Sequence, residues 1–262
     1  MRDDGPQVTA DDHELAHVIA SDIAEKLLAL QTNMVGDGAD HWDIELEGDR
    51  LAHSWILERV RSARPDDALL SEEGTDDQSR VSRSRAWIID PLDGSSGFGY
   101  GSPEWAVHIA LSIDGKPIVG AVAAPGIGAV ASTHEPPVLA DSNRSQPLVV
   151  TGRTRVYSEG ALLADVLDAK VVACSSAGVK AALVATSRAD VYVHDGPLYE
   201  WDVCAPAAMA LASGLFVSDR FGEPFEFNQT RPVVEGIVVC RPELQDVVLA
   251  TLAQRRNLGN LG

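Results

Sequence analysis

The pattern of apolar residues changes halfway along the chain, and this change limits the folds that the sequence can adopt. Before residue 134, two segments with apolar residues at helical spacing precede short apolar runs bounded by Gly, Pro and Asp-Gly, a pattern typical of helices beside a mostly antiparallel sheet. After residue 147, strand-like runs alternate with helical segments, as in α/β proteins. The sequence therefore predicts an α+β half at residues 1–140 and an α/β half at residues 148–262.

The first half is predicted to contain a helix pair and a sheet. Helical spacing places helices at residues 12–30 and 50–61, with Asp49 at or near the start of the second. Asp114-Gly115 predicts a tight hairpin turn. The strands are expected at residues 68–70, 86–89, 106–113, 118–123 and 129–132.

The second half is predicted to alternate strands with helices. His108 in the first half, and Tyr192 and His194 in the second, lie in predicted strands and are expected to be structural residues. The strands of the second half are expected at residues 148–150, 170–173, 190–193, 215–218 and 233–239. The helices are expected at residues 158–168, 178–186, 205–212 and 243–255.

The acidic composition excludes several functions. Lysine and arginine total 21 against 39 aspartates and glutamates, a formal net charge of −18 that repels nucleic acid polymers and anionic membrane surfaces. The longest weakly polar run, residues 118–132, contains a proline and several glycines and is too short to span a membrane. The N-terminus has no apolar signal segment, so a cytoplasmic location is expected. The acidic excess fits either a solvated surface or carboxylate clusters that bind cations.

One segment places several oxygen atoms at the end of a predicted strand. An apolar run leads directly into Asp-Pro-Leu-Asp-Gly-Ser at residues 90–95. The proline fixes φ and the glycine permits a tight turn, so the carboxylates of Asp90 and Asp93, the Leu92 carbonyl and the Ser95 hydroxyl can converge. Oxygen ligands of this kind suit Mg²⁺. Taken alone, the segment also fits an ordinary turn after a strand.

Two further acidic segments become informative in combination with this one. Glu72 and Glu73 directly follow a strand-like run, a position that also fits a solvated loop. Asp202 opens an alanine-rich helix, where an aspartate is most often an N-cap. Neither segment alone indicates a particular function, but the order of the three acidic segments along the chain is informative.

Together the segments resemble the lithium-sensitive, Mg²⁺-dependent phosphomonoesterases, which include inositol monophosphatase, fructose-1,6-bisphosphatase and the 3′-phosphoadenosine 5′-phosphate phosphatases. The pattern of that family is Asp, Glu-Glu, Asp-Pro-(Ile/Leu)-Asp-Gly-(Thr/Ser) and Trp-Asp, and all four parts occur here in order, with Asp49 lying 23 positions before Glu72. The resemblance covers residues 15–255. It implies the layered α/β/α/β/α sugar-phosphatase fold, sensitivity to lithium, and either a homodimer or a monomer.

The resemblance also implies a site that binds two or three Mg²⁺ ions. Glu72, Asp90 and the Leu92 carbonyl are expected to bind one ion. Asp90, Asp93 and Asp202 are expected to bind a second. A third, looser ion would use Glu72 and water molecules, with Glu73 nearby as a supporting carboxylate.

The same resemblance assigns expected roles in catalysis and phosphate binding. Asp49 and Ser95 are expected to form the hydrogen-bonded pair that orients and deprotonates the attacking water, with Glu72 also in the catalytic set. Ser95 stands where the family usually has threonine, which keeps the hydroxyl. The backbone N–H groups of Gly94, Ser95 and Ser96 are expected to face the phosphate. Asp93 and Asp202 are expected to be substrate-binding residues as well.

The second half favours a nucleotide substrate. The resemblance implies that Lys180 contacts a second, non-reacting phosphate and that Ser176 lies beside it. Two departures bear on the substrate: Ser96-Gly97 matches neither the inositol nor the nucleotide subfamily, and Ala177 replaces a serine three positions before that lysine. The segments that resemble actinobacterial 3′-phosphoadenosine 5′-phosphate phosphatases are residues 175–180, 183–186, 189–192, 200–206 and 222–228.

We therefore expect a phosphoric monoester hydrolase that removes the 3′-phosphate of a nucleoside 3′,5′-bisphosphate by direct attack of water. Within the same class of enzyme, an inositol or sugar phosphate monophosphatase and a specialised pathway nucleotide phosphatase remain alternatives. The alternative from another class is a catalytically silent acidic protein that binds cations or a partner.

Overall fold

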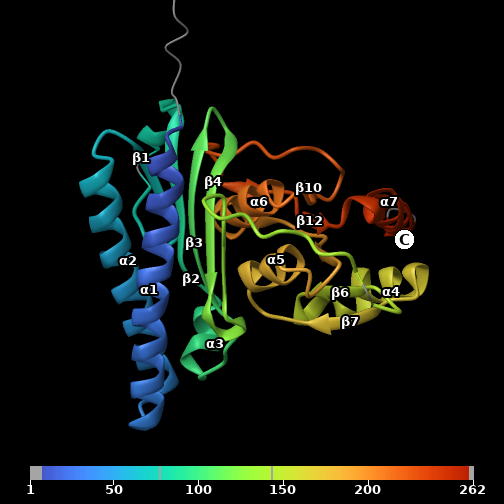
Figure 1. The fold of residues 1–262 in the computed structure, drawn as a ribbon, viewed down its shortest axis with the longest axis horizontal. Coiled ribbons are helices and arrows are strands. Elements are labelled where there is room, and N and C mark those ends of the chain that lie inside the picture. The colour runs from blue at the N-terminus through green and yellow to red at the C-terminus, as the bar shows by residue number, and fades with distance from the viewer. Residues whose placement is uncertain (1–7, 77, 143, 260–262) are drawn as a thin grey trace, which may run out of the picture.

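The chain folds into a layered α+β structure, which we describe from a computed structural model covering residues 8–76, 78–142 and 144–259. This architecture confirms the expected layered fold. Every helix in the described ranges is too short or too polar to be a transmembrane segment. From left to right, Figure 1 shows the helix pair α1 (Ala10–Gly36) and α2 (His41–Ala63), a first sheet, α5 (Ala177–Ala185) with α6 (Glu200–Ala212), a second sheet, and the outer helices α4 (Ala161–Leu167) and α7 (Gln245–Gly259).

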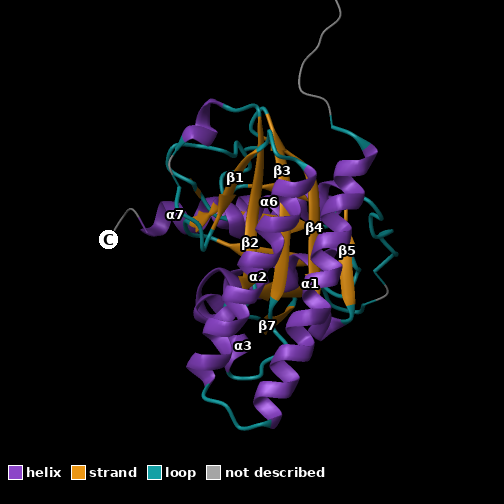
Figure 2. Cartoon of the chain, turned by 90° about the vertical axis from the view of Figure 1, so that its left-hand side faces the viewer, coloured by secondary structure: helices purple, strands orange, loops and turns teal. Residues whose placement is uncertain are grey.

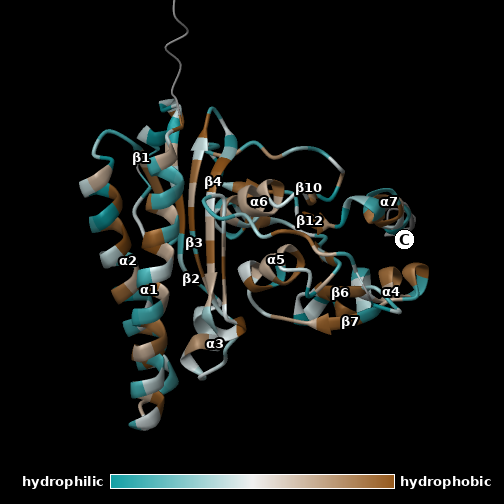
Figure 3. Ribbon diagram, in the orientation of Figure 1, coloured by the Kyte–Doolittle hydropathy of each residue, from teal (hydrophilic) through white to brown (hydrophobic). Residues whose placement is uncertain are grey.

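Helix α1 forms where the helical spacing predicts it. Ala16, Ile23 and Leu27 lie on one face of the helix and are fully buried in the cluster that also contains residues of the first sheet. At the N-terminus, the N–H of Thr9 donates to Asp12 Oδ2 at 2.9 Å, which completes a capping box. Figure 2 shows α1 and α2 in front of the first sheet, and Figure 3 shows polar and apolar residues alternating along both helices.

Helix α2 begins earlier than the apolar pattern predicts, which corrects the position of Asp49. The helix starts at His41, because the Asp40 side chain accepts a hydrogen bond from the N–H of Trp42 at 2.9 Å and so acts as the N-cap. The first turns bury little apolar surface, so the apolar pattern does not reveal them. At Gly48 the helix packs closely against Phe98, since an added Cβ would lie 2.7 Å from a ring carbon of Phe98. Asp49 therefore lies well inside α2 and not at its start.

The first sheet is mostly antiparallel, as predicted. Its strand order is β1-β2-β3-β4-β5, in which only the β1–β2 pair is parallel. The predicted hairpin joins β3 to β4, and both turn residues, Asp114 and Gly115, have positive φ values of 49° and 77°, as a type I′ turn requires. The strands are β1 (Ala68–Ser71), β2 (Arg85–Asp93), β3 (Ala106–Ile113), β4 (Lys116–Ala124) and β5 (Ala129–Ser132).

The second sheet has the order β10-β12-β8-β6-β7. β6 is parallel to both of its neighbours, whereas β12 is antiparallel to both of its own. The strand predicted at residues 233–239 is divided at Gly236, whose φ is 76° and whose added Cβ would lie 2.4 Å from the His194 carbonyl oxygen. The strands are β6 (Leu148–Thr151), β7 (Lys170–Ala173), β8 (Val191–His194), β10 (Phe216–Ser218) and β12 (Ile237–Cys240), with β9 (Leu198–Tyr199) and β11 (Val233–Val234) forming a separate pair.

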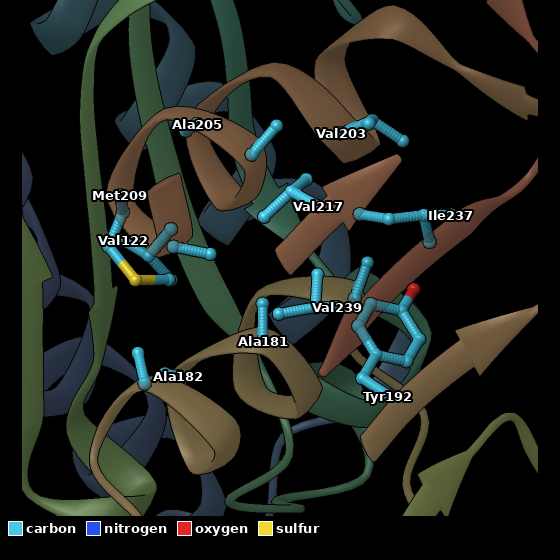
Figure 4. Packing of buried hydrophobic residues seen from close by; sticks show 14 of the residues in the cluster. Val122, Ala181, Ala182, Tyr192, Val203, Ala205, Met209, Val217, Ile237 and Val239 are labelled. Carbon is cyan, nitrogen blue, oxygen red and sulfur yellow. The ribbon is translucent and has the colours of Figure 1, made fainter. Parts of the chain in front are cut away.

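The largest buried cluster contains residues of both sheets and of the helices between them. Figure 4 shows Val122 of β4, Met209 of α6 and Val239 of β12 within this cluster. The middle helix layer is rich in alanine, so the backbones approach closely: a Cβ at Gly120 would lie 2.6 Å from the Ala205 carbonyl oxygen. Helix α6 begins at Glu200, five residues before the predicted helix. The division into halves at residues 140 and 148 stays a prediction.

Candidate active site

Strand β2 ends in the acidic segment, and a pairing irregularity lies between its two aspartates. Asp90 pairs with His108 and Asp93 with Ala106, so β2 carries one extra residue between them, as in a β-bulge. The N–H of Leu92 donates to Asp90 Oδ1 at 3.0 Å. The next residue after Asp93, Gly94, has a φ of 92° and leads into the short helix α3 (Ser95–Gly99). The expected contact of the N–H groups in this turn with phosphate stays a prediction.

Asp202 reaches the same place from the first turn of α6. The N–H of Tyr199 donates to Asp202 Oδ2 at 2.9 Å, so Asp202 serves in a capping box with Tyr199 as the N-cap. Carboxylate oxygens of Asp90, Asp93 and Asp202 all lie within 4.8 Å of one another. The structure thus brings together three of the residues that the resemblance implies as metal ligands.

Glu72 lies beside this cluster because β1 and β2 pair in parallel. Ser71 pairs with Ile89, and the N–H of Glu72 donates to the Ile89 carbonyl at 3.2 Å. The carboxyl groups of Glu72 and Asp90 influence each other's pKa. A fourth carboxyl group, from the residue directly after β1, therefore lies beside the three aspartates.

The electrostatics of the cluster fit a divalent cation. Burial, followed by repulsion from Asp93 and Glu72, raises the pKa of Asp90 well above its usual value. Burial and Asp93 also raise the pKa of Asp202 to about 7, and burial raises that of Glu72. A cation would offset both the burial and the mutual repulsion of these groups, and an all-oxygen donor set suits Mg²⁺.

Asp49 lies at the edge of the cluster on α2. Burial raises its pKa to about 7, and repulsion from Glu73, Glu45 and Glu72 adds to the effect. Asp49 therefore lies among carboxylates even though its place in the helix differs from the expected one.

The partner of Ser95 differs from the expected one. The resemblance implies a hydrogen bond between Ser95 and Asp49, but Ser95 Oγ donates to Glu45 Oε1 at 3.2 Å. Glu45 lies one turn before Asp49 in α2, so both side chains are on the same face of the helix. The second oxygen, Glu45 Oε2, is buried and has no hydrogen-bond partner among the described residues. The early start of α2 is the reason for this correction, since residues before Asp49 were not expected to be helical.

His108 contacts the cluster directly, although a structural role was expected for it. Its Nε2 lies 3.2 Å from Asp93 Oδ2, and its Nδ1 lies 3.1 Å from the Trp201 carbonyl oxygen. Burial alone would lower the pKa of His108, but Asp93, the Trp201 carbonyl and Asp202 together outweigh burial and raise it. The strand alternation groups residues 106, 108 and 110 on one face of β3, but it does not tell which neighbours that face meets.

Helix α5 supplies further contacts to Asp93. The N–H of Gly178 donates to Asp93 Oδ2 at 2.7 Å. The Ser176 hydroxyl also donates to Asp93 Oδ2 and accepts the N–H of Val179 as the N-cap of α5. Both hydrogen-bonding roles of Ser176 are therefore used within the protein, and its expected contact with substrate stays a prediction.

Lys180 lies in the same helix and is buried, with 3% of its surface exposed. Its Nζ donates to the carbonyl oxygens of Cys174 at 3.1 Å and Ser175 at 3.0 Å. Burial lowers the pKa of Lys180, and the nearby Asp93 opposes that shift. A lysine with this burial is not a solvated surface residue.

A cavity of about 270 Å³ lies between Lys180 and the carboxylates of Asp93 and Asp202. Arg153 at its rim donates to Glu104 Oε2 at 2.8 Å and to Ser175 Oγ at 3.0 Å. The cavity therefore has carboxylates and cations in its walls. The residues that line it are Asp93, Gly152, Arg153, Thr154, Ser175, Ala177, Lys180, Tyr192, His194, Leu198 and Asp202.

A buried polar network connects the loop after Glu73 with the start of α6. Arg80 pairs with Asp76 at 2.8 Å and donates to Asn228 Oδ1 at 3.0 Å. The Asn228 side chain donates to the Arg80 and Arg83 carbonyls, and its backbone N–H donates to Glu200 Oε2 at 2.7 Å. The sequence indicated Asn228 only as the last residue of a motif, because its partners lie far away along the chain.

Comparison with known proteins agrees with this geometry. The profile of the "Inositol monophosphatase family" matches residues 5–257. A "3′-phosphoadenosine 5′-phosphate phosphatase" of Mycobacterium tuberculosis is 36% identical over 225 residues, which cover 81% of this chain and 83% of that protein. The "3′(2′),5′-bisphosphate nucleotidase CysQ" of Escherichia coli K12 is 32% identical over 191 residues, covering 69% and 78% of the two chains.

Solved structures share the fold. The extragenic suppressor protein suhB of Bartonella henselae matches with a TM-score of 0.74 and 23% identity, covering 92% of this chain and 98% of that one. CysQ from Bacteroides thetaiotaomicron, described as a bacterial member of the inositol monophosphatase family, matches with a TM-score of 0.71 and 24% identity, covering 88% and 97%.

Proposed function

Since the chain belongs to the inositol monophosphatase family, we propose that it is a Mg²⁺-dependent phosphomonoesterase acting on nucleoside 3′,5′-bisphosphates such as 3′-phosphoadenosine 5′-phosphate. The observation that carries the proposal is the cavity that contains Asp93 and Asp202 together with the buried Lys180. Carboxylates that hold cations suit the reacting phosphate, and a buried ammonium suits a second phosphate. The names of the bacterial relatives support the same substrate class.

The proposed metal-binding residues are Glu72, Asp90, Asp93 and Asp202 with the Leu92 carbonyl, and Glu73 lies close enough in sequence to support a looser ion. When bound, Mg²⁺ would neutralise the phosphoryl oxygens, lower the pKa of a water molecule and stabilise the leaving oxygen. The contacts of His108 and Gly178 with Asp93 would hold that carboxylate in one orientation.

The remaining residues orient the reactants. We assign the water-binding role to Ser95 and Asp49, with Asp49 accepting the proton and Glu45 holding the Ser95 hydroxyl in place. The water oxygen forms a bond to phosphorus while the bond from phosphorus to the ribose O3′ breaks, and the ribose oxygen takes a proton from solvent. The products are a nucleoside 5′-phosphate and inorganic phosphate. No side chain becomes phosphorylated.

Phosphate release tests this function. We would compare 3′-phosphoadenosine 5′-phosphate, inositol 1-phosphate and fructose 1,6-bisphosphate at matched concentrations with Mg²⁺, each with an EDTA control. Preference for the nucleotide, abolished by EDTA, is the expected result. Preference for inositol or sugar phosphate would contradict the substrate class, and no release from any of the three would favour either an untested specialised nucleotide or a silent protein.

A variant pair tests the metal-binding residues in the same assay. Asp90→Asn is expected to lower kcat by at least about a hundredfold, since it removes a carboxylate shared by two proposed ion positions. Asp43→Asn, on the exposed face of α2, is the matched control and should leave kcat unchanged. Full activity of Asp90→Asn would rule out the proposed use of this cluster.

A further inference from the structure

Tyr192 carries a buried hydroxyl in the wall of the cavity, and the proposed mechanism does not use this group. It lies in β8, is fully buried, and lines the cavity together with Lys180. Among the described residues, its hydroxyl oxygen has no hydrogen-bond partner. An unpartnered buried hydroxyl costs about 1–3 kcal/mol, so its presence calls for a ligand or another explanation.

Lys180, in the same cavity wall, also has a hydrogen-bond donor position without a partner among the described residues. Its Nζ lies 5.2 Å from the centre of the Tyr192 ring. An ammonium has three donors, and the Cys174 and Ser175 carbonyls accept from two directions, which leaves one. The Tyr192 hydroxyl and the Lys180 ammonium therefore each have one N–H or O–H available for a ligand in the same cavity.

The other hydroxyls near this place are engaged, exposed or absent. Ser176 is bound to Asp93 and caps α5. The Ser175 hydroxyl accepts from Arg153. Ala177, which lines the cavity, has no hydroxyl. Thr154, which also lines the cavity, and Ser175 are exposed. Among the described lining residues, Tyr192 therefore has the buried hydroxyl without a hydrogen-bond partner.

The Tyr192 hydroxyl can donate a hydrogen bond to an anion at neutral pH. Burial raises the pKa of its hydroxyl well above the usual value, so the proton stays on the oxygen. A lysine ammonium is a donor without any acceptor atom. Two adjacent donors and a guanidinium at the rim suit the oxygen atoms of a phosphate group.

We propose that Tyr192 and Lys180 together bind the second, non-reacting phosphate of the substrate, and that the Tyr192 hydroxyl is a specificity-determining group for bisphosphates over monophosphates. This inference rests on the proposed function of the site.

The test is Tyr192→Phe, which removes only the hydroxyl and keeps the packed ring and its contact with Lys180. The substrates are 3′-phosphoadenosine 5′-phosphate and adenosine 3′-phosphate, which has the same reacting phosphate but lacks the second one. We expect KM for the bisphosphate to rise about tenfold with kcat nearly unchanged, and kcat/KM for adenosine 3′-phosphate to stay within about twofold of the parent. Tyr157→Phe, at a tyrosine that is 94% exposed, is the matched control and should change neither substrate.

Two further readouts separate the inference from its alternatives. Adenosine 5′-phosphate should inhibit Tyr192→Phe about tenfold more weakly than the parent, whereas inhibition by adenosine should be unchanged. The thermal stability of the ligand-free variant should not fall, because no hydrogen bond within the protein is lost. An unchanged KM for the bisphosphate, or an equal loss on both substrates, would overturn the inference. If the parent released no phosphate from either nucleotide, the proposed function itself would fail.

Discussion

At the scale of single residues, the position of the Ser95 hydroxyl depends on Glu45. We predict that Glu45→Ala lowers kcat at least about tenfold with little change in KM, because it removes the acceptor that orients Ser95 and a carboxylate that raises the pKa of Asp49, while the proposed metal ligands stay in place. Glu47→Ala is the control, since Glu47 points outward and pairs with Arg50 at 2.5 Å. Steady-state kinetics on the bisphosphate measures both variants. A Glu45→Ala protein with the kcat of the parent would show that the hydroxyl needs no such support.

The residues of this site differ in how far the sequence alone could predict them. The convergence of Asp90, Asp93 and Asp202 followed from motifs that resemble a known family. Glu45 could not be found in that way, because its role depends on where α2 starts, and the start is set by one cap at Asp40. His108 was expected to be structural because strand alternation shows that a face exists but not what it contacts.

At the scale of elements, Asn228 joins the loop after β1 to the first turn of α6. Its side chain makes hydrogen bonds with the Arg80 side chain and with the Arg80 and Arg83 carbonyls, and its φ of 62° is in the left-handed region. We predict that Asn228→Gly lowers the free energy of unfolding by about 2–3 kcal/mol through the lost hydrogen bonds. Asn228→Ala should cost about 1 kcal/mol more, because alanine resists a positive φ.

Urea denaturation of the parent and the two variants measures these free energies. Equal values for the glycine and alanine variants would mean that the backbone at residue 228 is not held at a positive φ. A glycine variant as stable as the parent would mean that the network contributes nothing to the connection between the two elements.

The elements themselves could be predicted from the sequence more completely than their ends. The strands Ala106–Ile113, Ala129–Ser132 and Lys170–Ala173 have the predicted bounds, because apolar alternation and turn residues mark them locally. The end points that differ depend on contacts that no local pattern contains. Gly236 divides a continuous apolar run because the backbone of His194 lies close to it, and α6 begins early because Asp202 binds the Tyr199 N–H.

At the scale of the whole molecule, stability should depend on Mg²⁺, since the carboxylates of the cluster come from β2 in the first sheet and from α6 in the middle layer. Without a cation these groups repel one another. We predict that Mg²⁺ at about a hundred times its Kd stabilises the parent by about 2.7 kcal/mol. Asp90→Asn should be at least as stable as the parent in EDTA and should lose most of the Mg²⁺ response.

Thermal denaturation with and without Mg²⁺ measures this response, with Asp43→Asn as the control. An Asp90→Asn protein that kept the full Mg²⁺-dependent rise in Tm would show that the stabilising ion binds elsewhere. This readout does not depend on catalysis, so it tests the cluster even for a slow enzyme.

A second prediction at this scale concerns pH. Burial, with Arg155 and Lys180 nearby, lowers the pKa of His194 to about 4 from an ordinary 6.5. Between these two pH values the unfolded chain binds a proton at His194 and the folded chain does not. The free energy of unfolding therefore falls as pH decreases from about 6.5 towards 4, by up to about 3 kcal/mol for this group.

His194→Gln should remove that part of the slope. Urea denaturation of the parent and the variant at pH 7.5 and pH 4.5, both in EDTA, measures it as the difference between their two changes. Equal pH dependence in the two proteins would mean that His194 is not held neutral by the fold.

The central claim is that the site removes the 3′-phosphate of a nucleoside 3′,5′-bisphosphate in a Mg²⁺-dependent reaction. The most direct measurement is the identity of the products from 3′-phosphoadenosine 5′-phosphate, separated by ion-exchange chromatography in the presence of Mg²⁺ and of EDTA. The account predicts adenosine 5′-phosphate and inorganic phosphate in equal amounts, and no product in EDTA. Adenosine 3′-phosphate as the product, or turnover that persists in EDTA, would contradict it.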